Sequence, residues 1–79
     1  MVKVKVLGTG CKNCQRLYGT VTETVRELGL AAVVEKVEDL AAIMSFGVMS
    51  TPALVVNGRV VLSGRVPGKE EVKKLLQGA

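Results

Sequence analysis

The chain has 79 residues, of which 48% are hydrophobic and 23% are charged, and it contains no histidine. A chain of this length forms one domain with a small core, so we treat residues 1–79 as a single domain. The net charge of +4 is scattered, and one Phe and one Tyr give no platform for stacking bases, so we expect no nucleic-acid binding. No apolar run approaches the roughly 18 residues of a membrane span, so we expect no membrane insertion.

The first half of the chain alternates between strand and helix patterns. Residues 2–7 (VKVKVL) have apolar side chains at every second position, which predicts a strand with one apolar face. Because this start lacks the apolar stretch of a signal peptide, we expect the protein to lie in the cytoplasm. After a break at Gly8 and Gly10, apolar residues recur at helical spacing from Cys14 to Leu28. This pattern predicts a helix that ends at the following glycine.

A second strand and a short helix follow. Residues 32–37 (AVVEKV) predict the strand, and Asp39 can cap the helix. We expect Leu40, Ile43 and Met44 to form the inner face of this helix, toward the sheet.

The second half begins with a hairpin. Residues 53–56 (ALVV) predict a buried strand, Asn57-Gly58 a two-residue turn, and residues 59–63 (RVVLS) the returning strand. A last helix is predicted over about residues 68–77. The sequence therefore predicts an α/β fold of order β-α-β-α-β-β-α, with a four-stranded mixed sheet whose first two strands are parallel.

Both cysteines lie between the first strand and the first helix, and three roles are open to them. A structural cross-link is the weakest, because so short a loop restrains the unfolded chain by roughly 2 kcal/mol, against about 4.5 for a loop spanning most of the chain. A zinc site needs four ligands, but two thiolates can hold soft Cu(I), so a copper carrier is the alternative function. Such carriers resemble the heavy-metal-associated domain, which ends on a strand and has Met where this chain has Thr9.

The third role is thiol–disulfide exchange. Cys11 falls at the start of the helix, where backbone N–H groups without helical partners favour a thiolate. Lys12 and Arg16 add positive charge nearby. Cys14 lies one turn further on, toward the buried side of the helix. We therefore assign Cys11 as the attacking thiol and Cys14 as the resolving thiol.

Two segments, GTGCKNC (residues 8–14) and GVMSTPALVVNGRVVLSGRVP (residues 47–67), resemble the thioredoxin-like superfamily. Among its members the chain is most similar to small thioredoxin/glutaredoxin-like redox-active disulfide proteins. The resemblance implies a minimal thioredoxin fold, with the first and last helices on one face of the sheet and the middle helix on the other. It also implies a cis peptide bond at Pro52, facing the cysteines, so that the backbone of Thr51 can pair with an extended substrate.

The resemblance implies a protein-disulfide reductase, a small electron carrier that a flavin-dependent NADPH reductase of the thioredoxin-reductase type keeps reduced. We expect the targets to be disulfide-containing proteins, and the chain to be a monomer that binds neither cofactor nor metal. Gly10, Lys12 and Asn13 would surround the thiolate. The chain departs from familiar members because Lys12-Asn13 stands between the cysteines, and because Lys5 occupies a position where thioredoxin has an acid.

Overall fold

The computed structural model describes residues 1–78 and has the predicted order of elements. The strands are β1 (Val2–Leu7), β2 (Ala32–Val37), β3 (Ala53–Val56) and β4 (Arg59–Ser63). The helices are α1 (Lys12–Leu28), α2 (Leu40–Ser45) and α3 (Lys69–Gln77). The sheet has the order β2-β1-β3-β4, with β1 parallel to β2 and antiparallel to β3, and β3 antiparallel to β4. The predicted four-stranded mixed sheet is thus confirmed.

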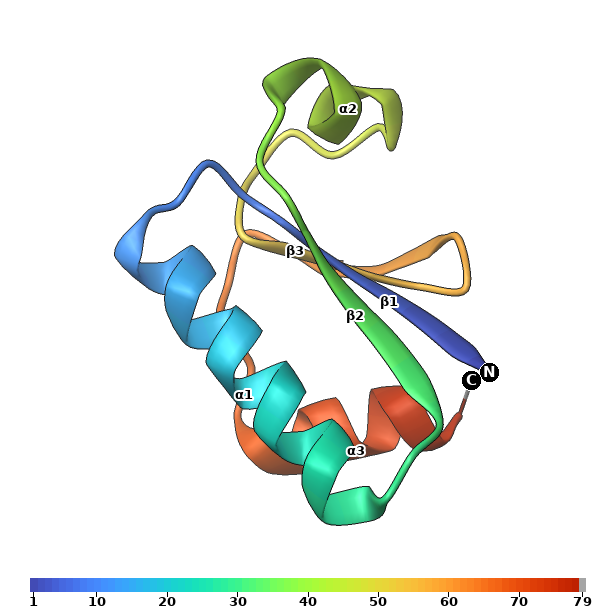
Figure 1. The fold of residues 1–79 in the computed structure, drawn as a ribbon. Helices are drawn as coiled ribbons and strands as arrows, with labels where there is room; N and C mark the ends of the chain where they lie inside the picture. Colours follow the sequence, from blue (N-terminus) through green and yellow to red (C-terminus); the bar gives the residue numbers. More distant parts are fainter. Residues whose placement is uncertain (79) are drawn as a thin grey trace.

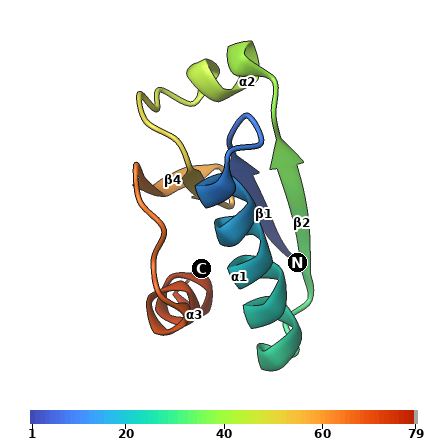
Figure 2. The same ribbon diagram turned by 90° about the vertical axis from the view of Figure 1, so that its left-hand side faces the viewer.

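Helices α1 and α3 cover one face of the sheet and lie side by side, as Figures 1 and 2 show. The alternation of β1 sends Val4 and Val6 to this face, where they are almost fully buried. They form the larger of two apolar clusters, together with residues from both helices and the hairpin: Leu17, Val21, Leu54, Val56, Leu62, Val72 and Leu76. The apolar periodicity of α1 therefore identified the buried side of this helix.

Helix α2 lies on the other face, near one end of the sheet (Figure 1). A smaller cluster there contains Leu7, Ala53, Val55 and Ile43. Our expectation for α2 was wrong in part, because Leu40 is 60% exposed and Met44 is 64% exposed. A helix of only six residues turns one narrow side toward the sheet, and Ile43 alone occupies it.

The ends of the elements follow from local signals. Asp39 caps α2 by accepting a hydrogen bond from the backbone N–H of Ala42 at 3.0 Å. Asn57 and Gly58 have φ angles of 52° and 82°, as a turn of type I′ requires. Helix α1 begins two residues before its apolar periodicity does, at Lys12, with Cys11 as the capping residue. No helix within residues 1–78 has the length and apolarity needed to cross a membrane.

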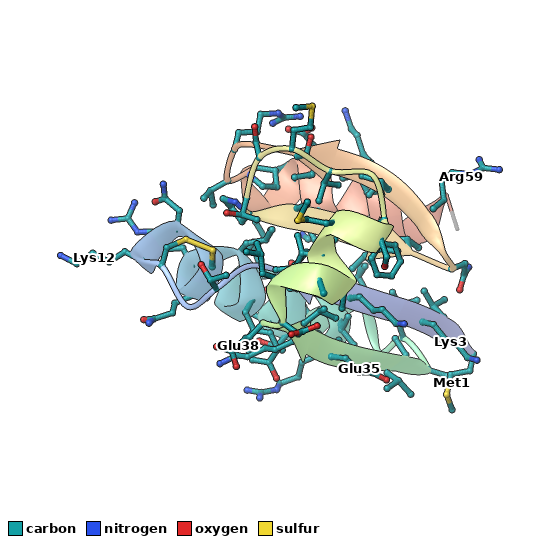
Figure 3. The ribbon with its side chains drawn as sticks, turned by 90° about the horizontal axis from the view of Figure 1, so that it is seen from above. Met1, Lys3, Lys12, Glu35, Glu38 and Arg59 are labelled. Atoms are coloured by element: carbon teal, nitrogen blue, oxygen red, sulfur yellow. A yellow bond between two sulfur atoms is a disulfide. The ribbon has the colours of Figure 1, made fainter. Side chains whose placement is uncertain are left out.

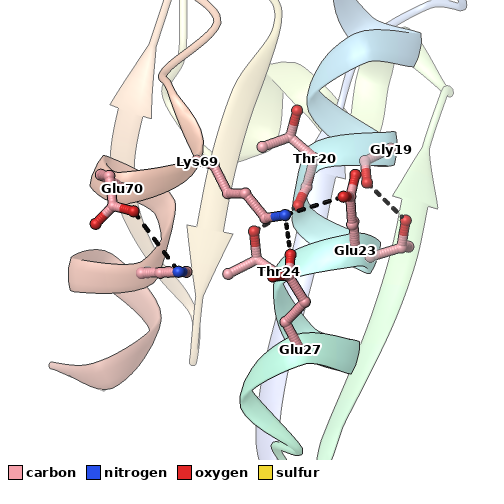
Figure 4. A network of polar contacts seen from close by, with 9 residues as sticks. Gly19, Thr20, Glu23, Thr24, Glu27, Lys69 and Glu70 are labelled. Carbon is pink, nitrogen blue, oxygen red and sulfur yellow. Dashed lines mark hydrogen bonds and ion pairs between the residues drawn. The ribbon is translucent and has the colours of Figure 1, made fainter.

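Ion pairs join α3 to α1 and to the segment before α3, and Figure 4 shows the pairs with α1. The Nζ atom of Lys69 lies 2.9 Å from an oxygen of Glu23 and also pairs with Glu27, both on α1. Arg65 binds both carboxylate oxygens of Glu71. The hydrogen bond from Lys69 lowers the pKa of Glu23, and the hydrogen bond from Arg65 lowers the pKa of Glu71.

These lowered pKa values predict a loss of stability in acid. A carboxylate that binds protons more weakly when folded stabilises the protein above its unfolded pKa, whose usual value is 4.5. That contribution disappears as the pH falls through the lower pKa of the folded state. Urea denaturation at low salt should show Glu23→Gln with a shallower decline in unfolding free energy below pH 4.5 than the unmodified protein. Glu35→Gln, which removes an exposed carboxylate from β2, should keep the full decline; equal declines in all three proteins would contradict the prediction.

Candidate active site

Cys11 occupies the N-cap position of α1. Its Sγ atom accepts a hydrogen bond from the backbone N–H of Cys14 at 3.1 Å, and its carbonyl accepts one from the N–H of Gln15 at 3.0 Å. The first N–H groups of a helix lack partners inside the helix, and the helix dipole is positive there. This environment favours the thiolate form of a cysteine, so Cys11 is placed to be a nucleophile.

Cys14 lies in the first turn of α1 and is only 5% exposed, whereas Cys11 is exposed. The two residues form a disulfide, with their Cα atoms 5.0 Å apart. Figure 3 shows the disulfide at the same end of the molecule as Lys12, far from Met1, Lys3 and Arg59. An incoming sulfur atom can therefore reach Cys11 much more easily than Cys14.

Gly8 lets the end of β1 approach the disulfide closely. Its N–H donates a hydrogen bond to the carbonyl of Val37 at 2.9 Å, which holds it in the sheet. A Cβ atom at this position would overlap Sγ of Cys14 and lie 2.8 Å from its Cβ. The sequence identified Gly8 only as a break after the strand, because a contact with a residue six positions away depends on the folded loop.

The other predicted site residues of this loop lie beside the disulfide in sequence and are exposed. Gly10 has a φ angle of 90°, and its carbonyl accepts a hydrogen bond from the side chain of Gln15 at 3.1 Å. Lys12 and Asn13 occupy the first turn of α1 with exposed side chains. These residues leave the outer side of Cys11 open to a partner.

The Thr51–Pro52 peptide bond is cis and lies in the segment that leads into β3. Pro52 is buried, and its carbonyl accepts a hydrogen bond from the N–H of Gly64 at 2.9 Å. Thr51 is exposed. Figure 1 shows this segment, α2 and the loop between β1 and α1 gathered at one end of the molecule.

A groove of about 370 Å³ connects these parts. Thr9, two residues before Cys11, lines it together with Thr51. Its remaining walls are apolar and come from α2 and the segment after it: Leu40, Ile43, Met44, Val48 and Met49. The side chain of Met49 is 99% exposed. The outward positions of Leu40 and Met44, which the sequence analysis placed in the core, thus form part of this surface.

A second cavity, of about 250 Å³, lies on another side of the disulfide. It is lined by backbone and side chains from β1, the following loop, α1 and the end of β2: Val6, Gly8, Gly10, Cys14, Gln15, Lys36 and Glu38. The sequence analysis did not predict Lys36 or Glu38 at the site. The parallel pairing of β1 with β2 brings them there, because the carboxyl ends of parallel strands meet at one edge of a sheet.

A zinc-type metal centre would need more ligands than the two cysteines supply. Among residues 1–78, no group of three or more His, Cys, Asp or Glu side chains is placed to hold a metal ion. The described chain also has α3 as its last element, whereas the copper carriers considered above end on a strand.

Comparison with known proteins decides the family. The family model described as Thioredoxin domain matches residues 2–77, almost the whole chain. The chain belongs to the thioredoxin family. It is 43% identical over 76 residues to a thioredoxin of Methanothermobacter thermautotrophicus, which covers 96% of this chain and 99% of that protein. A thioredoxin of Methanocaldococcus jannaschii is 36% identical over 77 residues, covering 98% of this chain and 88% of that protein.

The fold agrees with a solved structure as well. The germline-specific thioredoxin Deadhead from Drosophila melanogaster superposes with a TM-score of 0.70 at 20% identity, over 98% of this chain and 79% of that one. The superfamily and fold predicted from the two sequence segments are therefore confirmed. With its Cys11–Cys14 disulfide and its thioredoxin relatives, the protein is a thiol–disulfide oxidoreductase.

Proposed function

We propose that the protein reduces disulfide bonds in other proteins, with Cys11 attacking and Cys14 resolving. The difference in exposure between the two cysteines carries this assignment. The thiolate of Cys11 attacks one sulfur of the target disulfide, and the other target sulfur leaves as a thiolate. Cys14 then attacks Sγ of Cys11, which releases the second target sulfur and forms the Cys11–Cys14 bond. Two electrons pass from the protein to the target.

Target proteins bind across the end of the molecule that carries the disulfide. Thr51 is exposed, and its backbone offers hydrogen-bonding groups to an extended target segment, which is a form of strand addition. The apolar groove beside Thr51 takes an apolar side chain that flanks the target disulfide. Gly10, Lys12 and Asn13 border the thiolate, and the positive charge of Lys12 favours it.

The dithiol is regenerated by a flavin-dependent NADPH reductase of the thioredoxin-reductase type. The chain itself holds no cofactor and acts as a monomer of one thioredoxin-like domain, residues 1–79. Its place is the cytoplasm, where thiols are kept reduced and a dithiol carrier can be recharged.

The assignment of the two thiols can be tested by alkylation. In the reduced protein near neutral pH, iodoacetamide should modify Cys11 at least about ten times faster than Cys14, because Cys11 is exposed and lies at the helix start. Peptide mapping after a short pulse measures both rates. The reduced protein should also cleave the disulfides of insulin, with dithiothreitol as the electron source.

In a control reaction in concentrated guanidinium chloride, the two rates should become nearly equal, because the helix that distinguishes the thiols is lost. Faster labelling of Cys14 in the native protein would reverse the roles proposed here. Failure to cleave insulin or any other protein disulfide would exclude the proposed function.

A further inference from the structure

The resolving thiol must lose a proton before it can attack. A thiol carries a proton on its sulfur atom, and only the deprotonated thiolate displaces sulfur from a disulfide. Cys14 is 5% exposed, and burial in apolar surroundings disfavours the charged form. Bulk water has little direct access to this sulfur, so a nearby group that accepts its proton would speed the resolving step.

The 250 Å³ cavity beside Cys14 contains such a group. Two of its lining residues have charged side chains: Lys36, near the end of β2, and Glu38, directly after it. Glu38 is exposed, and its Oε2 atom lies near the loop that precedes Cys11, 3.4 Å from where a Cβ atom of Gly10 would be. The cavity is many times larger than one water molecule requires, so water can connect Glu38 with the sulfur of Cys14.

The other charged groups near the site point elsewhere. Lys36 places its Nζ atom 4.5 Å from the ring centroid of Tyr18, and as an ammonium group it cannot accept a proton. Lys5 lies on the opposite face of the sheet, 5.5 Å from the ring centroid of Phe46. Lys12 and Arg16 are exposed cations on α1. Within residues 1–78, Glu38 is the one carboxylate that lines the cavity with Cys14.

We propose that Glu38 transfers the proton to and from Cys14 through water in this cavity. This inference rests on the proposed function. When Cys14 attacks Sγ of Cys11, its proton passes to the carboxylate of Glu38, the bond between Cys11 and the target breaks, and the target thiolate takes a proton from solvent. When the reductase later opens the Cys11–Cys14 bond, Glu38 returns a proton to the departing sulfur of Cys14.

The resolving step can be observed separately with the chromogenic disulfide dithiobis(nitrobenzoate) in stopped flow. Attack by Cys11 releases one coloured thiolate, and attack by Cys14 then releases the second. With the reagent in large excess, Glu38→Gln should leave the first phase unchanged and slow the second at least about tenfold near pH 6. Between about pH 5.5 and pH 7.5, where carboxylic acids are ionised and thiols are not, the unmodified protein should show a nearly flat second-phase rate. In the Gln variant the second-phase rate should instead fall close to tenfold for each unit by which the pH is lowered in this range.

Two further variants complete the test. Glu38→Asp keeps a carboxylate at the cavity and should restore most of the second phase. Glu35→Gln removes an exposed carboxylate from β2 and should change neither phase. Equal second-phase rates and pH profiles in Glu38→Gln and the unmodified protein would overturn the role of Glu38. So would a slowing of both phases, or the same slowing in Glu35→Gln. Absence of a Cys11-dependent first phase in the unmodified protein would instead count against the proposed function.

Discussion

Replacement of Cys14 by Ser should turn the protein into a trap for its targets. Cys11 keeps its exposure and its place at the helix N-terminus, and the backbone N–H of residue 14 can still donate to its sulfur. The first attack therefore proceeds, but a serine hydroxyl cannot displace the target sulfur. We expect turnover with insulin to fall at least about a thousandfold, while stable mixed disulfides through Cys11 accumulate.

Non-reducing electrophoresis and mass spectrometry would identify these adducts, and an added thiol should release them. Cys11→Ser is the matched control, because the buried thiol of Cys14 is then the only thiol in the protein. This variant should give neither turnover nor adducts. A Cys14→Ser protein with normal turnover would contradict the two-thiol mechanism. Adducts that form through Cys14 in the Cys11→Ser protein would contradict the order of attack.

Much of the fold could be predicted because its signals are local. The alternation of β1, the apolar spacing along α1 and the Asn57-Gly58 turn each lie within a short stretch of sequence. Because these local signals agree with one another, they fit few other orders of helices and strands. The roles proposed for Cys11 and Cys14 also rest on local geometry, because a helix start exposes one position and its first turn buries another.

The surroundings of the cysteines were harder to predict because they depend on tertiary contacts. Helix α2 is too short for periodicity to show which of its sides meets the sheet, so Leu40 and Met44 were misplaced. Glu38 reaches the cavity through the pairing of two parallel strands, in which Val6 lies opposite Lys36. The position of Glu38 could have been inferred from the predicted parallel pairing of the first two strands, since that pairing places the segment after β2 beside the loop after β1.

Gly8 is the residue whose substitution outside the cysteines should have the largest effect. A methyl group in Gly8→Ala would overlap Sγ of Cys14, and it has no room to retreat because the backbone of Gly8 is hydrogen-bonded to Val37. The first turn of α1 must then shift. Overpacking of this kind typically costs about 1–3 kcal/mol of unfolding free energy. The cost should be greater in the oxidised protein, where the bond to Cys11 holds the sulfur in place, than in the reduced protein, where the thiol can rotate away.

Gly19→Ala provides the matched control for this substitution. Gly19 lies in the middle of α1, and a Cβ atom there would meet no other atom within 4 Å. The change should therefore raise the unfolding free energy by about 0.5–1 kcal/mol, because alanine favours the helix more than glycine does. Urea denaturation of both variants, each oxidised and reduced, measures the four changes in unfolding free energy relative to the unmodified protein. A Gly8→Ala protein as stable as the unmodified chain in the oxidised state would show that the disulfide does not need a glycine at the end of β1. Opposite signs for the two variants would locate the effect in the contact with Cys14, since both substitutions add the same methyl group.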